Sequence, residues 1–375
     1  MTSWLIIPRQ ISWIQFTNSK HPAASDAAGW ARRFAGRLGR LRGNDCCHAR
    51  AGDETLNQGA TVTIVVVPRE RFSHARRSLE SVYQNTDYPF ELIYVDGNSP
   101  AYVSQYLQKA SIERHFRLVR SEEFLTPNQA RNLGLREVRS KYVVFLDNDV
   151  EVEPGWLTHL ITCAEETGAW AVGPLYFQGE PADRIIHMYG GTVELTETDG
   201  ARFFDEEHTL NQRTYAEVGA DLRRRETDFI EFHCALFSLN ALRTLGPLDE
   251  HYKSNHEHID ISLLIRKAGG TVYVEPKSFV TYVDGLLDTF DLEFALLRWS
   301  DDWNRKSAQH FVEKWKIDAG CQWYDSVIRW GANHREHLAR NRYSLVSVLK
   351  HHAARNLLTR RMYSTLRDFR HREAH

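Results

Sequence analysis

Two aspartates one residue apart follow an apolar stretch in the middle of the chain. The run from Tyr142 to Leu146 leads directly into Asp147-Asn148-Asp149. Such a run predicts a strand buried on both faces, and ligands of an open parallel sheet gather beyond the carboxyl ends of its strands. Two carboxylates delivered there can hold a hard divalent cation, which in turn holds phosphate oxygens. A solvated turn is the alternative, because Asp and Asn are frequent in turns.

More polar residues stand at neighbouring strand ends. A second apolar run is followed by Asp96 and a Gly-Asn-Ser turn, and the first run is followed by Pro68-Arg69-Glu70. Between Asp96 and the Asp147-Asn148-Asp149 motif, Arg131 and Asn132 lie near the start of an expected helix. An arginine and an amide there could offer positive charge and hydrogen bonds to a phosphate or a ribose.

These residues are carried by apolar β-branched runs that alternate with amphipathic segments. We expect strands at residues 61–67, 90–95, 116–119 and 142–146, and helices at 73–83, 101–110 and 126–138. Strands that alternate with helices at this spacing predict an α/β layer with a parallel sheet.

The alternation loosens after Pro154. We expect a helix at 156–166, a strand at 169–176, renewed order at 229–237, a helix at 259–268, short strands at 271–274 and 278–283, and mostly helix from Leu287. Residues 196–227 show no clear period. A segment of that length is usually a functional loop or lid, or is disordered.

The motifs, in this order and spacing, resemble the nucleotide-sugar half of a family 2 glycosyltransferase with the GT-A fold. The matching stretches are 62–67, 95–99, 130–134 and 145–149. Farther on, Leu245–Glu250 resembles the family's Gly-x-Phe-Asp-Glu turn, and Glu257–Asp260 stands where the family has a Glu-Asp-x-Asp helix start. The resemblance covers about residues 61–283. It implies an α/β fold with a Rossmann-like mixed sheet flanked by helices, followed by a mostly helical C-terminal extension.

The resemblance also implies a role for each matching residue. Nucleotide-sugar binding falls to Pro68, Arg69, Glu70, Asp96, Arg131, Asn132, Asp147 and Asn148. Asp147 and Asp149 would hold Mg²⁺ or Mn²⁺ on the diphosphate, with Asp149 the favoured direct ligand. The catalytic base is expected to be Glu257, His258 or Asp260, in that order of preference.

The implied reaction is the metal-dependent, inverting transfer of a sugar to an acceptor hydroxyl. The donor would be a UDP-, GDP- or dTDP-sugar, and the acceptor a glycan or a lipid-linked sugar in glycan or polysaccharide biosynthesis. The metal neutralises charge on the departing nucleoside diphosphate, and the base takes the proton of the attacking hydroxyl.

Three positions depart from the family pattern. Asp96-Gly97 replaces two adjacent aspartates, His258 stands where the base is commonly an aspartate, and residues 279–283 lack the histidine that many relatives use as a metal ligand. His256, His258 or water could fill that ligand position. A separate transition-metal site of His256, His258 and Asp260 is a weaker alternative, because residues two apart on a helix do not share a face.

Two further groups are candidates for an acceptor loop. They are His187–Gly191 and the pair Glu231 and His233. For His233, a hydrogen-bonded histidine of the core is an equal alternative.

Rival functions fit less well. A haloacid-dehalogenase-type phosphatase also places Asp-x-Asp after a buried strand, but it has Thr or Val where this chain has Glu151. A dehydrogenase is disfavoured because no Gly-x-Gly-x-x-Gly follows a strand. The stronger alternative is a catalytically impaired nucleotide-sugar-binding or scaffold protein that keeps the GT-A fold, since His258 replaces the usual base.

The charge of the chain is unevenly divided. Its 375 residues carry a net −2, yet residues 1–60 hold +4, residues 331–375 hold +7 and the middle holds −13. The near-neutral total argues against a surface built for nucleic acid. The basic ends, including an expected amphipathic helix at 27–43, are candidates for contact with an anionic membrane or with a second copy of the chain.

Several features bear on location and domain limits. Five cysteines without a Cys-x-x-Cys pair favour a reduced setting, and the first residues lack the apolar core of a signal peptide. We expect a cytoplasmic protein, with peripheral contact at the inner face of the membrane as an open alternative.

We expect three regions along the chain. They are a basic extension and linker at 1–60, a GT-A domain at 61–285 with nucleotide-binding and acceptor halves at 61–150 and 151–285, and a helical, basic region at 286–375.

Overall fold

A computed structural model describes residues 61–284, 287–318 and 322–340 of the chain. The expected basic helix at 27–43, the linker after it and most of the basic C-terminal stretch lie outside these residues. Within the described part, no helix combines the length and apolarity that crossing a membrane requires.

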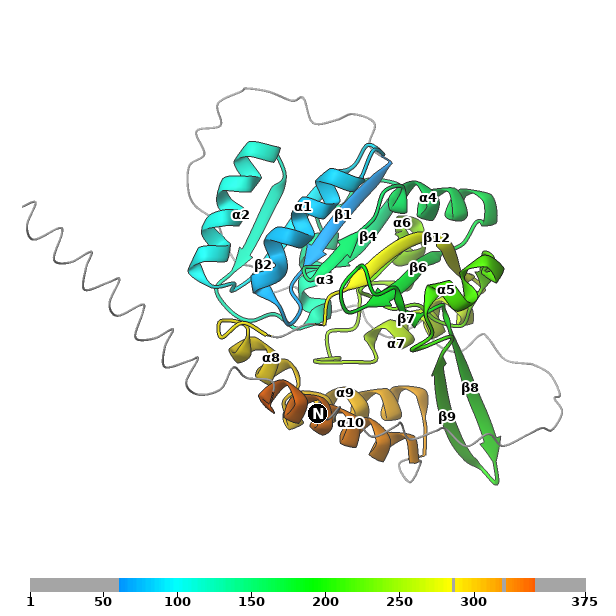
Figure 1. Cartoon of the computed structure of the whole chain (residues 1–375). Helices are drawn as coiled ribbons and strands as arrows, with labels where there is room; N and C mark the ends of the chain where they lie inside the picture. The colour runs from blue at the N-terminus through cyan, green and yellow to red at the C-terminus, as the bar shows by residue number, and fades with distance from the viewer. Residues whose placement is uncertain (1–60, 285–286, 319–321, 341–375) are drawn as a thin grey trace, which may run out of the picture. The chain divides into compact units, whose positions relative to one another are not determined.

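The first half of the fold is a parallel sheet, drawn in blue to green in Figure 1. Its strands follow the spatial order β3-β2-β1-β4. They are β1 (Val62–Val67), β2 (Glu91–Gly97), β3 (Arg117–Ser121) and β4 (Tyr142–Asp147). Every residue of β1 and β4 is buried, as expected for apolar runs covered on both faces. The four expected strands are therefore confirmed.

Three helices connect these strands. They are α1 (Ala75–Asn85), which follows the 3₁₀ turn Phe72–His74, then α2 (Ala101–Arg114) and α3 (Pro127–Leu135). Thr126 and Gln129 form a capping box at the start of α3. Gly134 lets α3 lie directly on the sheet, because a Cβ there would come within 2.3 Å of Val65 Cγ1. This close packing holds Arg131 and Asn132 above the ends of the strands.

The second half continues the sheet with mixed strand directions. Strand β11 (Cys234–Ser238) runs antiparallel to both β4 and β6 (Ala171–Gln178), and β12 (Val272–Tyr282) runs parallel to β6. Short strands complete the edges: β5 (Val150–Val152), β7 (Ile185–Met188) and β10 (Arg225–Glu226). The mixed sheet with flanking helices agrees with the expected fold class.

The remaining helices lie around this second half and beyond it. They are α4 (Trp156–Thr167), α5 (Tyr215–Val218), the 3₁₀ turn Gly219–Asp221, α6 (Leu239–Leu245), α7 (Glu257–Lys267), α8 (Leu292–Arg298), α9 (Asp301–Trp315) and α10 (Gln322–Arg340). The last three confirm the expected helical C-terminal region as far as residue 340. Figure 1 shows α8, α9 and α10 below the sheet, beside the strand pair β8 and β9.

Part of the segment expected to be irregular is a β-hairpin, so that expectation was wrong there. Strands β8 (Gly191–Thr198) and β9 (Ala201–His208) pair antiparallel along their full lengths. The two residues between them, Asp199 and Gly200, both have positive φ. Asp-Gly is a strong sequence signal for such a two-residue turn, but the polar strands beside it hide the apolar periodicity.

The two short strands expected at 271–274 and 278–283 form one strand. Strand β12 shifts its register on β6 between Glu275 and Phe279. Pro276 explains the irregularity, because proline has no backbone N–H to give to a neighbouring strand. The bulge lets a single strand continue past the proline to Tyr282.

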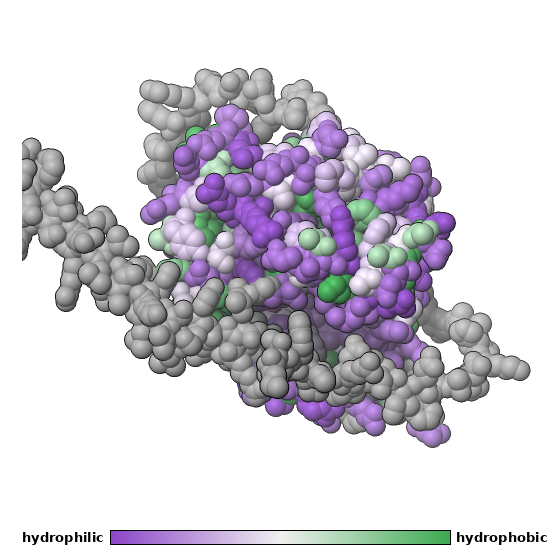
Figure 2. Space-filling view, viewed as in Figure 1, coloured by the Kyte–Doolittle hydropathy of each residue, from purple (hydrophilic) through white to green (hydrophobic). Residues whose placement is uncertain are grey.

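The surface agrees with the charged composition. The face shown in Figure 2 is mainly hydrophilic, with apolar residues scattered among the polar ones. The largest exposed apolar side chains of the described residues include Leu195 and Phe203, both on the hairpin.

Candidate active site

Asp147 and Asp149 lie at the carboxyl end of β4, where the sequence places them. Both are buried, and Asn148 between them ties β4 to the end of β1. The backbone N–H of Arg69 donates to Asn148 Oδ1 over 2.7 Å. The ends of the two central strands are therefore fixed side by side, with the three residues of the motif facing the residues that follow β1.

Two arginines and one histidine surround Asp147. Arg69 Nη1 lies 3.1 Å from Asp147 Oδ2, Arg131 Nη2 lies 3.4 Å from Oδ1, and His233 Nδ1 lies 3.3 Å from Oδ2. Burial alone would raise the pKa of Asp147, but Arg69, His233 and Arg131 together lower it. Asp147 is thus held as a carboxylate with both oxygens engaged.

Asp149 has the opposite environment. It is fully buried, and neither carboxylate oxygen has a hydrogen-bond partner. Arg71 Nη1, the nearest charge of opposite sign, is 3.8 Å from Oδ2. Burial, together with Glu70 and Asp147, raises the pKa of Asp149 well above its usual range. A buried carboxylate with free oxygens fits a hard divalent cation, which would supply the missing charge.

The residues after β1 are held by the C-terminal helices. Trp299 Nε1 donates to Glu70 Oε1 over 2.7 Å, and Arg298 Nε lies 3.3 Å from the same oxygen. Arg69 Nε lies 3.1 Å from the other oxygen of Glu70. Pro68 lies against the end of β2, because a Cβ built on Gly97 would come within 2.8 Å of its ring. The sequence did not predict the partners Arg298 and Trp299.

Asp96 and Asn132 each have close partners. Asp96 accepts from the backbone N–H of Ser99 over 2.8 Å and pairs with Arg120. Asn132 donates to the carbonyl of Leu248 over 2.8 Å and accepts from the N–H of Leu248 over 3.0 Å. Asn132 therefore fixes the turn that follows α6 on top of α3.

The three candidate bases differ in their surroundings. Glu257 Oε1 pairs with Arg131 over 3.2 Å, while Oε2 is buried without a partner. Burial opposes ionisation of Glu257, but Arg131 outweighs it and lowers the pKa. Asp260 is fully engaged: it accepts from Tyr252 and Trp315 and pairs with Lys314 over 2.8 Å. Glu257 thus keeps a free oxygen near Asp147, because Arg131 contacts both carboxylates.

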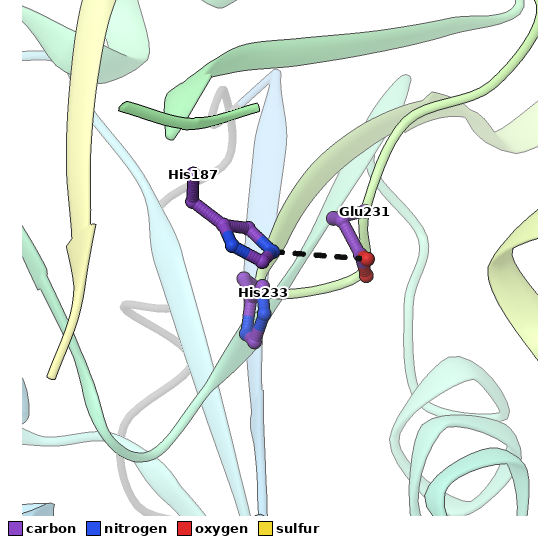
Figure 3. Close-up of side chains that lie close together, drawn as sticks. All are labelled: His187, Glu231 and His233. Atoms are coloured by element: carbon purple, nitrogen blue, oxygen red, sulfur yellow. Dashed lines mark ion pairs between the residues drawn. The ribbon is translucent and has the colours of Figure 1, made fainter. Parts of the chain in front are cut away.

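His258 belongs to a second group, which surrounds Glu231. The Nε2 atom of His258 lies 3.5 Å from Glu231 Oε1, and those of His208 and His187 lie 3.6 and 3.9 Å from the same oxygen. Figure 3 shows His187 facing the carboxylate of Glu231, with His233 beside them. The sequence singled out His187, Glu231, His233 and His258 separately, and missed His208. No local signal marks His208, since the hairpin brings it in from 50 residues before His258.

Histidine protonation in this region follows burial. Burial lowers the pKa of His208 to about 4 despite the attraction of Glu231. Burial and Arg69 lower the pKa of His233 to about 4 as well, despite its contact with Asp147. Both imidazoles are therefore neutral near pH 7, and His233 is a core histidine that also contacts the site.

The suggested trio of His256, His258 and Asp260 does not converge. His256 Nε2 lies 3.8 Å from Glu206, His258 faces Glu231, and Asp260 faces Lys314. The three side chains leave α7 and the residue before it in different directions, as expected for such spacing on a helix.

A cavity of about 500 Å³ lies elsewhere. Residues of α1, β5 and the segment 181–184 line it, and it contains none of the candidate residues named above.

The fold and the site together define a class of protein. Residues 63–246 match the family model described as Glycosyl transferase family 2. The chain thus carries a family 2 glycosyltransferase domain, which confirms the resemblance found in the sequence.

Particular relatives are distant. An uncharacterized glycosyltransferase of Rickettsia bellii (strain RML369-C) is 28% identical over 90 residues, which make up 24% of this chain and only 13% of that protein. Among solved structures, GalNAc-T7 with UDP, GalNAc and Mn²⁺ has a TM-score of 0.47 and 17% identity, over 69% of this chain and 51% of that one. Residues 1–349 of S. aureus TarS in complex with UDP-GlcNAc have a TM-score of 0.44 and 14% identity, over 73% and 72%.

Proposed function

We propose that this chain is a metal-dependent, inverting glycosyltransferase that moves a sugar from a nucleotide-diphosphate sugar to an acceptor hydroxyl. The donor is a UDP-, GDP- or dTDP-sugar, and the acceptor is a glycan or a lipid-linked sugar. The observation that carries the proposal is the pair Asp147 and Asp149 at the end of β4, inside a family 2 domain. One carboxylate is saturated by arginines and the other is free for a cation.

The donor side of the reaction falls to the residues around this pair. Asp149 would hold Mg²⁺ or Mn²⁺, and such an ion supplies positive charge beside the departing diphosphate. Arg69 and Arg131 orient Asp147 and are close enough to share their charge with the phosphates. Residues 68–70 and Asp96, at the ends of β1 and β2, would bind the base and ribose.

The attacking hydroxyl of the sugar acceptor needs a base that takes its proton. Glu257 and His258 are both retained as candidate bases, since each has a buried polar atom without a partner. Asp260 is assigned a structural role, because Tyr252, Trp315 and Lys314 use both of its oxygens. A base within hydrogen-bond reach takes the proton as the hydroxyl oxygen attacks the anomeric carbon. Direct displacement then inverts that carbon.

The experiment is a survey of donors with the purified full chain. Nucleotide binding and slow hydrolysis are measured for UDP-, GDP- and dTDP-sugars with Mg²⁺, Mn²⁺ or chelator. We expect one nucleotide class to bind only with metal, and Asp149→Ala to abolish the metal dependence. Glu151→Gln, two residues along the chain, is the matched control. Equal affinity of Asp149→Ala and wild type, with and without chelator, contradicts the proposal. Binding without any turnover favours the impaired nucleotide-sugar-binding protein instead.

A further inference from the structure

Four side chains from separate segments converge beside the candidate active site. His187 comes from β7, His208 from the end of β9, Glu231 from the loop before β11 and His258 from the first turn of α7. Glu231 is 91% buried, and the Nε2 atoms of His187 and His258 are buried without a hydrogen-bond partner. We call these four residues the histidine group.

The distances in the histidine group are too long for hydrogen bonds. The three Nε2 atoms lie 3.5, 3.6 and 3.9 Å from one oxygen, Glu231 Oε1. Good N–H···O bonds span about 2.7–3.2 Å. Ligands of a tetrahedral ion that binds nitrogen at about 2.0–2.1 Å lie about 3.4 Å apart. The ligand atoms of His208, Glu231 and His258 lie within 4.8 Å of one another, and so do those of His187, Glu231 and His233, so two trios share the Glu231 carboxylate. The spacing in the trio of His208, Glu231 and His258 matches a coordination shell better than a hydrogen-bonded network.

Another cluster in the same chain provides an internal comparison. Asp249 also meets two histidines, but His251 Nδ1 and His310 Nε2 both lie 2.8 Å from its oxygens, and so does Lys314 Nζ. Those contacts are complete hydrogen bonds and leave no ligand position open. A histidine next to a carboxylate therefore does not by itself indicate a metal site. The surroundings of Glu231 differ from those of Asp249 in their longer N···O distances and their unpartnered nitrogens.

We propose that Glu231 and two members of the histidine group, His208 and His258, bind a divalent transition-metal ion, with His187 beside the shared carboxylate. Imidazole nitrogens with one carboxylate suit ions such as Zn²⁺, Co²⁺ or Mn²⁺, whereas Mg²⁺ prefers oxygen ligands. The ion would be separate from the one proposed at Asp149. His233 lies between the two places, in contact with Asp147 on one side and beside His187 on the other.

The ion would link segments that lie far apart in the sequence. It would join the hairpin, the loop before β11 and the start of α7, and so fix the acceptor half of the fold. With its Nε2 on the ion, His258 is no longer a proton acceptor at that atom, which leaves Glu257 as the base. The metal site itself does not depend on the proposed function, since it requires no nucleotide.

The test uses the full chain, stripped with chelator and free of nucleotide. Co²⁺ alone is titrated by visible absorption, and Zn²⁺ content is measured after gel filtration. We expect one ion per chain that excess Mg²⁺ does not displace. His208→Asn and Glu231→Gln should weaken Co²⁺ binding about 100-fold or more. His251→Asn, the matched control from the Asp249 cluster, and Asp149→Ala should bind as the wild type does.

X-ray absorption of the Zn²⁺-loaded wild type makes the test independent of variants that fail to fold. Scattering from at least two imidazoles is expected. A wild type that binds neither ion overturns the proposal, as does a zinc shell without imidazole, or an ion lost in Asp149→Ala but kept in His208→Asn. These results are separable from donor turnover, because a failed donor survey leaves the nucleotide-free titration unaffected.

Discussion

The two charged clusters beside the end of β4 contrast in how their charges are satisfied. Around Asp147, two arginines meet two carboxylates, Asp147 and Glu257, at 3.1–3.4 Å. Around Glu231, three imidazoles remain at 3.5–3.9 Å from one oxygen. In the first cluster the charges of the chain's own residues are paired, and in the second no cation contacts the carboxylate at hydrogen-bond distance. The imidazoles around Glu231 are also less buried: 14–24% of their side-chain surface is exposed, against 1–3% for Arg131, Asp147 and Glu257.

The contrast distinguishes a cluster that stabilises the fold from a cluster that is arranged to bind a ligand. A buried ion pair that has lost one partner costs several kcal/mol, so the arginine cluster must be essential for folding. A group whose members do not yet bond to each other contributes little until its ligand arrives. The following predictions, from the largest expected effect to the smallest, test this difference.

Replacing Arg131 should have the largest effect. Arg131→Met leaves the buried Asp147 and Glu257 without a shared cation, and should lower the free energy of unfolding by about 3–5 kcal/mol. Urea denaturation measures this change. Arg136→Met, at the exposed residue that caps the C-terminus of the same helix, should change it by less than about 0.5 kcal/mol. Equal effects of the two variants would show that the buried network does not stabilise the fold.

Replacing Glu257 should affect turnover more than folding. Glu257→Gln keeps the shape and removes the charged oxygen, and should reduce kcat for donor hydrolysis about 100-fold, which corresponds to about 2.7 kcal/mol. Asp260→Asn should destabilise the protein, yet leave kcat of the folded fraction within a few-fold of wild type. An unchanged kcat in Glu257→Gln would transfer the role of base to His258.

Asp249 offers a prediction with a defined pH dependence. Burial opposes ionisation of Asp249, but Lys314, His310 and His251 lower its pKa below the usual 3.8. The stabilisation is therefore complete above about pH 4 and declines as the pH falls through the lower, folded-state pKa. Asp249→Asn should lose about 1 kcal/mol at pH 7 and less at pH 3.5, by thermal unfolding.

Asp302→Asn is the control for Asp249. Its pair with Lys306 is exposed on the surface of α9, and should contribute almost nothing at either pH. A penalty for Asp249→Asn that stays constant from pH 7 to pH 3.5 would refute the proposed ionic stabilisation.

Glu231 should give the smallest change when no metal is present. Glu231→Gln breaks no short hydrogen bond of its side chain with the three histidines, so the metal-free protein should lose less than about 0.5 kcal/mol. Addition of Zn²⁺ should then stabilise the wild type and not the variant, because an ion that binds only the folded state adds its binding free energy. Thermal unfolding with and without Zn²⁺ measures both. A large loss of unfolding free energy in the metal-free variant would show that the Glu231 cluster, like the Asp147 cluster, stabilises the fold without a ligand.

The sequence predicted most of the parallel sheet and the position of the aspartates. Runs such as those of β1 and β4 are apolar throughout, because both faces of a central strand are buried, and polar residues begin where the strand ends. Asp147 and Asp149 were found by that rule. The hairpin was missed because its strands lie partly in solvent, where apolar periodicity weakens and only Asp199-Gly200 carries a signal.

The histidine group could not be assembled from the sequence for a different reason. His187 and His258 were visible as candidates, but their common partner depends on contacts between segments far apart in the chain. The same holds for Glu70, whose partners Arg298 and Trp299 come more than 220 residues later. Local patterns locate strand ends well, and they carry no information on which distant helix closes over them.

The contacts of the C-terminal helices limit how the domain can be rearranged in evolution or by engineering. The family match ends at residue 246, yet Glu70, Asp249 and Asp260 take hydrogen-bond donors from residues 298–315. A transplant that stopped near residue 285 would leave the buried Glu70 and Asp260 and the partly buried Asp249 without those donors. Residues 61–285 therefore cannot be transferred between proteins as an independent domain. The smallest unit that can be exchanged includes α8 and α9.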